Sequence, residues 1–578
     1  MSAALRNFSS FAWRSCRLAT EGDWRYYAWI GVLFAGCVLG VNAYARQLSE
    51  GLITSGMNDH VAWGVYIANF TFLVGVADAA VMLVIPVYLY KREELQDFVV
   101  FGILLAIVAI LMCLVFVMVD LGRPDRFWHM IPGVGKFNFP ESLLSWDVIV
   151  LNGYLAMNIY ICGYLLYRRY QRKPLVGWHY IPWIFLSIFW AIAIHTVTAF
   201  LYVGLAGRPF WNNSIVGPRF IASAFVSGPA LVILAMRMVR RVTASTPAEG
   251  QTVPRRESHL AQHFSRPATL ADFKALQKHL PEIGEVPDET LEKCLSDSVV
   301  IEANKDEVLL WQGDTDREAF FIVRGRVVVK LEETGRQRVI QSVGPGELCG
   351  EISALTGSPR TATAIAEEPV QVLRLTATSL RRLLKHPRLD HLVRTRMTER
   401  LMITDRALLT LRSIVQVSMV VNVFLLLNEL FKEFYTSDLH AASAHYLYFG
   451  LHGKAALVPW IWTAVACNLA AMVLLMLPVS RSLKWLDLAC VLAIVGVWIE
   501  KGMGLVVPGQ IPSPLGEIVE YTPTLDETVI CFSIWAFGLL CYTVALRVAI
   551  PILQGRFSAN NGNASSAPPP GNQPVQNS

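Results

Sequence analysis

Charged residues are scarce in this chain: Asp, Glu, Lys and Arg make up only 16% of its 578 residues, whereas 54% are apolar. A soluble globular protein carries about a quarter charged residues. The composition therefore excludes a wholly soluble protein and predicts a polytopic membrane protein. The formal net charge of +5 is small for this length, and most Lys and Arg lie at the ends of apolar runs. A nucleic acid partner is not predicted.

Metal-ligand spacing is also missing. The ten cysteines are scattered singly, mostly within apolar runs, and no C-x-x-C pair or cluster-type spacing occurs. Only His195 lies in the middle of an apolar run, so the paired axial histidines of a b-type haem are missing. The sequence predicts no iron–sulfur cluster, no structural zinc and no haem in this chain.

Apolar runs of about 20 residues, the length needed to cross a bilayer as a helix, recur along the chain. Six precede and four follow a polar interval, at about 28–49, 61–90, 97–120, 147–167, 181–204, 219–238, 411–432, 456–478, 485–507 and 528–550. Lys and Arg in the connections are about twice as frequent on the side of the two termini, which the positive-inside rule assigns to the cytoplasm. Arg219 and Lys501 are counted with the connections of the outer face. We therefore expect an inner-membrane protein with cytoplasmic termini and a cytoplasmic polar interval.

The predicted fold is mainly α: a transmembrane bundle of about ten helices, divided 6+4, with an inserted cytoplasmic β-roll domain. The expected parts are an N-terminal segment 1–27, a first membrane block 28–241, a soluble domain 242–405 with its core at about 285–385, a second membrane block 406–552 and a disordered tail 553–578. The first apolar run ends in Ala43-Tyr44-Ala45, which resembles a signal-peptidase site, but its length favours an uncleaved span.

The soluble domain consists of short β-rich runs separated by turns, between about 290 and 380, a pattern typical of a barrel or jelly roll. Amphipathic helices are expected at about 270–280 and 286–296 before it and at 377–405 after it. Residues 346–364 read G-E-L-C-G-E-I-S-A-L-T-G-S-P-R-T-A-T-A. A helix opening at Gly350-Glu351 would direct free backbone N–H groups at an anion, and Arg360 would add a charged clamp. This segment closely resembles the phosphate-binding cassette of cyclic nucleotide-binding domains.

The resemblance implies that Glu351 holds the ribose 2′-hydroxyl and that Arg360 holds the cyclic phosphate. The phosphate oxygens would also accept from N–H groups near Gly350, Ser353, Ala354 and Thr361. The implied regulatory ligand is cAMP or cGMP, and the hydroxyl of Thr361 does not decide between them. The alternative is a degenerate domain that keeps the fold and binds nothing.

Charged side chains inside a bilayer are costly and therefore mark candidate functional positions. Asp78 lies deep in the second apolar run, and Asp147 opens the fourth. Asp120, Glu429 and Glu500 lie near the ends of apolar runs, where they could equally reach the interface. Loop 120–147 gathers charged and aromatic residues among Pro and Gly, which suits a quinol pocket at membrane depth or an ordinary interfacial loop with an aromatic belt.

Several motifs of the membrane blocks resemble those of the NrfD-like family, the quinone-interacting membrane subunits of polysulfide reductase-type assemblies. Besides loop 120–147 they are W-G-V-Y-I-A-N-F (63–70), I-H-T-V-T-A-F-L (194–201), G-R-P-F-W-N (207–212), P-R-F-I-A-S-A-F (218–225) and E-K-G-M-G-L-V-V-P-G (500–509). The resemblance implies a quinone, either menaquinone or ubiquinone, bound near the outer face. It also implies an iron–sulfur partner subunit on the periplasmic side that exchanges electrons with the quinone pool. The cyclic nucleotide domain departs from the usual architecture of this family.

For quinone chemistry we predict His129 and Asp147 as head-group and proton partners, with Asn69, Asp78 and His195 in or near a proton route. Such a chain would be a subunit of a respiratory quinol oxidoreductase and not an enzyme on its own. A nucleotide-regulated channel is disfavoured because the sequence has no Arg-repeat voltage sensor and no T-V-G-Y-G filter. A transporter with a regulatory domain is the main alternative, although no internal repeat is evident.

Overall fold

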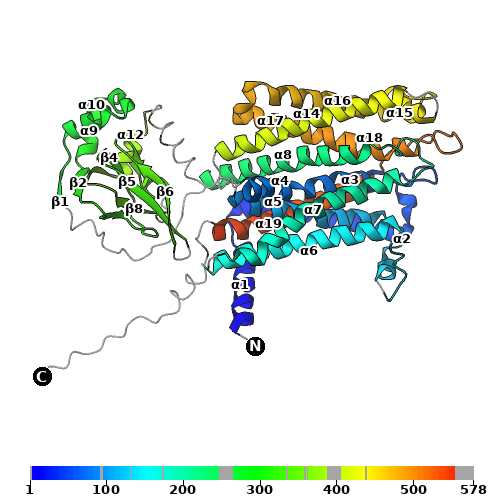
Figure 1. Ribbon diagram of the computed structural model, residues 1–578, viewed down its shortest axis with the longest axis horizontal. Helices are drawn as coiled ribbons and strands as arrows, with labels where there is room; N and C mark the ends of the chain where they lie inside the picture. The colour runs from blue at the N-terminus through cyan, green and yellow to red at the C-terminus, as the bar shows by residue number, and fades with distance from the viewer. Residues whose placement is uncertain are drawn as a thin grey trace. The chain divides into compact units, whose positions relative to one another are not determined.

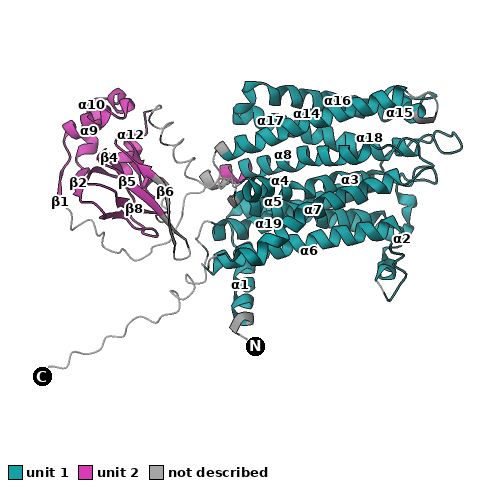
Figure 2. Ribbon diagram, viewed as in Figure 1, with its two compact units in different colours: residues 1–237, 406–578 teal, residues 238–405 magenta. Residues whose placement is uncertain are grey.

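The chain forms two compact units in the computed structural model, residues 1–237 with 406–578 and residues 238–405, coloured teal and magenta in Figure 2. The structure describes residues 3–90, 96–131, 133–171, 173, 175–245, 264–333, 336–356, 360, 362–386, 389, 393, 405–435, 439–553 and 557. The predicted disordered tail lies outside the described residues apart from Leu553 and Phe557. So does most of the predicted helix 377–405 beyond residue 386.

The first unit contains ten helical segments that are long and apolar enough to cross a membrane, counted over the described residues. They are Trp24–Glu50 (α2), Val65–Leu89 (α3, α4 and η2), Phe98–Asp120 (within α5), Leu143–Tyr170 (α6), Gly177–Val203 (α7), Val216–Arg240 (within α8), Ala407–Tyr435 (within α14), Val458–Met476 (α16), Leu483–Gln510 (α17, η8, α18 and η9) and Leu525–Leu553 (α19). The prediction of a mainly helical chain with ten membrane helices is confirmed.

Two further helices of this unit do not qualify as spans. α1 (Ala3–Thr20) lies across one end of the membrane helices (Figure 1), where Phe11 packs against Tyr170 of α6. α15 (Leu439–Phe449) follows α14. The full bounds of the longer elements are Gln96–Asp120 for α5, Val216–Ser245 for α8 and Asp405–Tyr435 for α14, and short turns lie at Leu52–Thr54 (η1), Pro124–Met130 (η4) and Pro478–Arg481 (η7).

The distribution of apolar side chains over the faces of a helix decides whether that helix lies at the centre or at the edge of the bundle. The spans of α3 and α5 are apolar on all sides and are mostly buried, whereas α2 and α19 leave most of their surface exposed. Helices buried on all faces belong to the centre of a bundle. α2 and α19 pack along each other, and Gly40 permits this approach because a Cβ there would lie 2.0 Å from Cβ of Ser533.

Two of the spans depart from regular α-helix. The second is divided at Asp78, which ends α3 (Val65–Ala77) and precedes α4 (Ala79–Val84) and the π-helical turn η2 (Ile85–Leu89). The ninth passes from α17 (Leu483–Trp498) through the π-helical turn η8 (Ile499–Met503) into α18 (Gly504–Val506) and η9 (Pro508–Gln510). Irregular backbone at membrane depth occurs where it is enclosed by protein or lines a cavity, and π-helical turns are frequent at functional sites.

The second unit is a β-roll of two antiparallel sheets, ordered β1-β2-β9-β4-β7 and β3-β8-β5-β6. The strands are Phe264–Pro267 (β1), Val299–Ala303 (β2), Val308–Leu310 (β3), Glu318–Arg324 (β4), Val327–Glu333 (β5), Arg336–Val343 (β6), Leu348–Cys349 (β7), Thr363–Ala366 (β8) and Val370–Thr376 (β9). The predicted β-rich domain is confirmed, with β1 and β7 in addition to the predicted runs.

Helices cover one side of this β-roll. They are α9 (Leu270–Gln277), η6 (Pro281–Glu285), α10 (Asp288–Leu295) and α12 (Ala377–Leu383). Phe273, Cys294 and Leu380 from these helices form one core with Leu373 of β9. A second core between the sheets includes Phe320 and Val372. The short helix α11 (Glu351–Thr356) follows β7 directly, so that the predicted phosphate-binding segment begins at the edge of a sheet.

Candidate functional site

The predicted nucleotide cradle opens with Gly350, whose φ of +81° lies in the left-handed region. Glycine is required there because L side chains rarely adopt this conformation, and a Cβ would lie 2.3 Å from Nη1 of Arg360. Glu351 follows as the first residue of α11 and is only 2% exposed. Ala354 is buried as well. The tight turn and the short helix are thus arranged as the sequence motif predicts.

Arg360 is 3% exposed and is held from two directions. Its Nε and Nη2 donate to the two carboxylate oxygens of Asp316 at 2.7 and 2.5 Å, and its Nη1 donates to the carbonyl of Gly350 at 2.8 Å. Ser353 donates from its hydroxyl to the backbone carbonyl of Asp316 at 2.7 Å. The structure therefore brings Gly350, Ser353 and Arg360 together around Asp316, a residue that the sequence analysis missed. Thr361 lies outside the described residues.

Asp78 and His195 meet in the middle of the membrane unit. Oδ2 of Asp78 lies 3.2 Å from Nδ1 of His195, which also lies 3.1 Å from the carbonyl oxygen of Ala191. Both residues are buried, at 3% and 0% exposure. Oδ1 of Asp78 and Nε2 of His195 have no hydrogen-bond partner within the described part of the chain. A buried polar atom left unpaired is costly, so these two atoms mark a position where water or a ligand can bind.

Asp147 is the second predicted carboxylate that the structure buries. It lies in the first turns of α6 and accepts from the hydroxyl of Thr198 at 3.2 Å. Thr198 follows His195 by three residues on α7, so the two side chains share one face of that helix. The Asp147 and Asp78 carboxylates are therefore both contacted from the same face of α7.

His129 lies apart from these buried groups. It is exposed on η4, where its ring packs against Trp128 with centroids 3.9 Å apart. No hydrogen bond or ion pair joins it to Asp147 within the described residues. In the same loop Arg123 donates to both oxygens of Asp125 at 3.0 and 2.9 Å. This interaction lowers the pKa of the Asp125 carboxyl.

Both polar atoms of the Asn69 side chain form hydrogen bonds. Its Oδ1 accepts from the indole N–H groups of Trp498 and Trp535 at 3.0 and 2.9 Å. Its Nδ2 donates to the carbonyl of Val65 at 2.8 Å. Asn69 thus joins α3 to α17 and α19, and these contacts give it a structural role in addition to the predicted place near a proton route.

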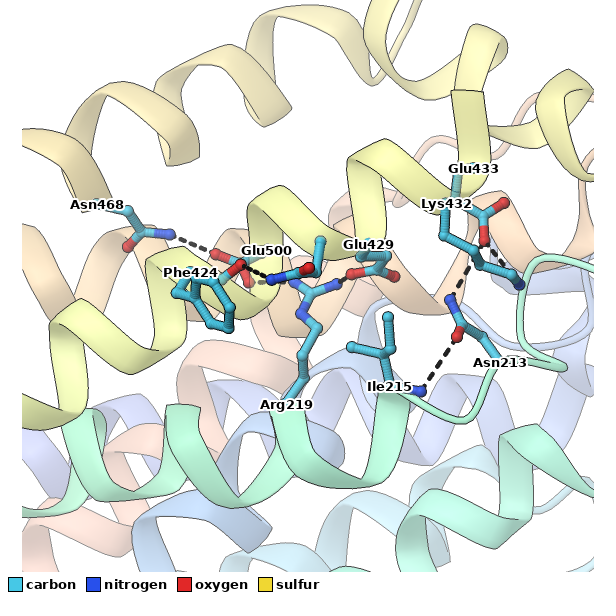
Figure 3. Close-up of polar contacts among 10 residues, drawn as sticks. Asn213, Ile215, Arg219, Phe424, Glu429, Lys432, Glu433, Asn468 and Glu500 are labelled. Carbon is cyan, nitrogen blue, oxygen red and sulfur yellow. Dashed lines mark hydrogen bonds and ion pairs between the residues drawn. The ribbon is translucent and has the colours of Figure 1, made fainter. Parts of the chain in front are cut away.

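A buried charge cluster surrounds Arg219, as Figure 3 shows. Arg219 rises from the first turn of α8 and forms ion pairs with Glu429 of α14 and Glu500 of η8. Asn468 of α16 donates to the other oxygen of Glu500. Nearby, Asn213 donates to Glu433 at 3.3 Å. Glu429 and Glu500 were ambiguous helix-end residues in the sequence, and the structure places both inside the bundle.

Lys501 is also inside the bundle, with 4% of its surface exposed. Its Nζ donates to the carbonyl of Phe220 at 3.3 Å and lies 4.4 Å from the centroid of the Phe220 ring. Counting Arg219 and Lys501 as outer-face loop charges was wrong, because each is enclosed by several helices. The sequence did contain a sign that these charges are buried. Glu500 and Lys501 are adjacent within an apolar run, and a regular α-helix could not bury both side chains on one face.

Two cavities adjoin this cluster. One of about 20 Å³ is lined by Val216, Arg219, Phe220, Ser223, Glu500, Lys501 and Leu505. The other, also of about 20 Å³, shares Arg219, Glu500 and Leu505 with it and reaches Glu429, Glu433 and Tyr448. Such cavities have space for water, and their charged lining offers the several polar partners that a buried water needs.

Comparison with known proteins finds a match for part of each unit. Residues 54–257 match the family model of polysulphide reductase, NrfD, and residues 300–386 match the cyclic nucleotide-binding domain. A putative dimethyl sulfoxide reductase membrane subunit from Halobacterium salinarum is 29% identical over 241 residues, which cover 39% of this chain and 54% of the relative. The Hdr-like menaquinol oxidoreductase integral membrane subunit of Archaeoglobus fulgidus is 23% identical over 225 residues, covering 39% and 53%.

The soluble unit has its own relative. The cyclic AMP receptor protein of Thermus thermophilus is 34% identical over 68 residues, which cover 12% of this chain and 32% of that protein. The chain spans about half the length of the two membrane relatives that it matches. Residues 54–257 of this chain are thus similar to the polysulphide reductase, NrfD family, and residues 300–386 are similar to the cyclic nucleotide-binding domain.

Proposed function

We propose that this chain is the quinone-interacting membrane subunit of a respiratory oxidoreductase complex. It passes electrons between the quinone pool and an iron–sulfur partner subunit on the periplasmic side, and its soluble domain binds cAMP or cGMP as a regulatory ligand. The names of the membrane relatives, a menaquinol oxidoreductase subunit among them, support the quinone part. The match to the cyclic nucleotide-binding domain supports the regulatory part.

The observation that carries the quinone proposal is the set of buried proton-exchanging groups along one face of α7. Oxidation of a quinol releases two electrons and two protons, so the protein must supply proton acceptors at membrane depth. Asp147 with Thr198 and Asp78 with His195 are such groups. In this proposal Asp147 accepts from the head group, the exposed His129 is a second head-group partner, and Asp78 and His195 continue the proton route.

A quinol-analogue titration of the purified full-length protein tests this proposal, with binding followed by quenching of tryptophan fluorescence. We expect saturable binding in the wild type and at least about tenfold weaker binding for Asp147→Asn, since a hydrogen bond to a charged group contributes about 1.5–3 kcal/mol. Asp125→Asn is the matched control, because Asp125 is exposed in the same loop, and it should bind as the wild type does. Unchanged binding by Asp147→Asn would reject the assignment.

The nucleotide part rests on the cradle of Gly350, Glu351, Ser353, Ala354, Arg360 and Thr361. Arg360 provides the cation for a cyclic phosphate, and the phosphate competes with the Asp316 carboxylate for the same guanidinium. Glu351 accepts from the ribose hydroxyl. A competition experiment between cAMP and cGMP identifies which of the two the domain prefers.

Calorimetric titration of the full-length protein with cAMP and with cGMP tests the cradle. Arg360→Lys should weaken nucleotide binding at least about tenfold, because lysine cannot reproduce the forked geometry of the guanidinium. Arg374→Lys serves as the control. It alters an ion pair between Arg374 of β9 and Glu318 of β4, and this variant should bind the nucleotide normally. A folded wild-type protein that binds neither nucleotide would show that the domain is degenerate.

A further inference from the structure

The helix α1 is a basic amphipathic helix to which neither the quinone proposal nor the nucleotide proposal assigns a role. It contains three arginines and no Asp or Glu. One side of it packs against the end of α6, where the ring of Phe11 lies 4.8 Å from the ring of Tyr170. Nη1 of Arg14 donates to the hydroxyl of Tyr170 at 3.2 Å. Ser15 and Leu18 continue this half-buried side at helical spacing.

The turn between α1 and α2 is held by hydrogen bonds. The hydroxyl of Tyr26 donates to the carbonyl of Ala19 at 2.7 Å, and Nη2 of Arg547 on α19 donates to the carbonyl of Glu21 at 2.8 Å. α1 therefore begins where the span of α2 begins, and its direction is fixed. In Figure 1 it crosses the ends of the membrane helices instead of continuing along them. A helix in this position lies along the surface of the bilayer.

The exposed surface of α1 is divided into an apolar stripe and a basic side. Phe8, Ala12 and Cys16 are exposed and follow one another at intervals of four residues, so they form one stripe beside the side that packs on α6. Arg6 and Arg17 are exposed on the third side, where they align because they are about three helical turns apart. Helices with one apolar and one arginine-bearing face lie in the interface of a bilayer.

The groups around α1 match the chemistry of lipid head groups. Trp13 and Trp24 are both 74% exposed, and tryptophan is enriched where a bilayer meets water. Arginines next to the end of a span attract anionic lipids, and the forked guanidinium binds two oxygens of one phosphate. The partner that fits this surface is therefore an anionic phospholipid.

We propose that α1 lies in the bilayer interface and binds anionic phospholipids on the side where α2 begins. Phe8, Ala12 and Cys16 contact the acyl chains, and Arg6 and Arg17 bind the phosphates. Arg17 also pairs with Glu21 at 2.9 Å, but an exposed ion pair contributes little, so its guanidinium can exchange this carboxylate for a phosphate. This function is independent of quinone and nucleotide binding.

A bimane fluorophore attached to Cys16 of the full-length protein in phosphatidylcholine vesicles tests the position of α1. Cys16 is exposed, whereas the other cysteines are buried or half-buried, and Cys16→Ser measures background labelling. We expect nitroxides on lipid acyl chains to quench this label and iodide in water to quench it weakly. Ser10→Cys in the Cys16→Ser background is the matched position, because Ser10 follows Arg6 by one helical turn. Iodide should quench a label there strongly.

Strong quenching by iodide at both positions would place α1 in water and overturn the proposal. Protection of the Cys16 label from both quenchers would overturn it as well, because protein and not lipid would then cover the apolar stripe.

The choice of lipid is tested with the same Cys16 label. Nitroxide-labelled phosphatidylglycerol should quench it at lower concentration than nitroxide-labelled phosphatidylcholine does. Arg6→Gln and Arg17→Gln should each weaken this preference about fivefold, which corresponds to about 1 kcal/mol for an arginine near an anionic surface. Arg126→Gln is the control, because Arg126 is exposed on η4 at the other end of the spans, and it should keep the preference.

Thermal unfolding of each variant verifies the fold. Equal quenching of the wild type by the two lipids would overturn the recognition of anionic lipid, and so would a preference that neither arginine variant changes.

Discussion

Asp78 and His195 depend on each other at the centre of the membrane unit, since each is the buried polar partner of the other. Replacing His195 with leucine leaves the Asp78 carboxyl without this partner. We expect His195→Leu to lower the free energy of unfolding by about 3 kcal/mol, the usual cost of breaking a buried pair on one side. His179→Leu, at an exposed position of the same helix, should change it little. Thermal unfolding in detergent compares the two, and equal midpoints would contradict the expectation.

Gly350 is the residue on which the nucleotide cradle depends. Alanine at this position would have to adopt a φ of +81° and approach Nη1 of Arg360. We expect Gly350→Ala to destabilise the domain by about 1 kcal/mol or more and to weaken nucleotide binding with it. Gly313→Ala is the control for backbone strain. Its φ is also positive, at +93°, but no atom lies near the added Cβ. Normal nucleotide binding by Gly350→Ala would show that the cradle tolerates a side chain.

At the scale of single elements, α9 shows how side chains start a helix. Thr269 and Asp272 form a capping box, and Arg266 donates to both oxygens of Asp272 at 2.8 and 2.6 Å. Chiefly the hydrogen bonds from Arg266 lower the pKa of Asp272 to about 2. Because the folded pKa lies below the model-peptide value of 3.8, this stabilisation is complete above that value and is lost as the pH falls toward 2.

We therefore expect Asp272→Asn to destabilise residues 264–393 by about 1 kcal/mol at neutral pH, as loss of a helix cap does. The difference should shrink as the pH falls below about 4 and should be nearly lost at about pH 2. Pulse proteolysis of the full-length protein in urea measures the difference at each pH. Asp288→Asn, at an exposed position in the first turn of α10, is the control. A difference that persists at pH 2 would contradict this account.

At the scale of the whole molecule, the two helices that lead into and out of residues 246–404 meet through a buried ion pair. α8 carries Arg219 near its beginning, and α14 carries Glu429 near its end. A cyclic nucleotide can alter the membrane unit only if it binds one arrangement of these helices better than another.

We expect saturating cyclic nucleotide to change the affinity for the quinol analogue by a factor of about 5–150, the usual range of allosteric coupling. By linkage the quinol analogue must change the nucleotide affinity by the same factor. Two titrations of the full-length protein, each with and without the other ligand, measure both factors. Arg360→Lys should shift the effect to nucleotide concentrations at least about tenfold higher. Identical affinities in all conditions would reject any coupling between the two units.

Much of this architecture could be predicted from the sequence. The apolar runs predicted the membrane helices because burying a polar backbone in lipid leaves only helices or closed barrels as solutions. The alternation of short β-rich runs and turns predicted the β-roll, and the resemblance of residues 346–364 to a phosphate-binding cassette implied its cradle. Asp78 was singled out because a charge in the middle of an apolar run is costly wherever the helix lies.

Other features could not be predicted in this way. Arg219 and Lys501 were taken for loop charges, since hydropathy along the chain does not show that several helices enclose both of them. Asp316 was missed because it precedes its partner Arg360 by more than 40 positions, a separation at which no local pattern joins two residues. His129 and Asp147 belong to one segment of the sequence, yet one is exposed and the other buried.

Local features of the sequence were sufficient to predict about ten membrane spans and a β-rich domain that resembles cyclic nucleotide-binding domains. Hydropathy, strand alternation and a contiguous motif are local properties, and they depend little on the rest of the fold. The pairing of polar groups in the membrane unit became visible in the folded chain alone: His195 with Asp78, Thr198 with Asp147, and Arg219 with Glu429 and Glu500. Those contacts depend on how separate helices pack and on the π-helical turn η8, because the angle at which a side chain leaves its helix decides its partner.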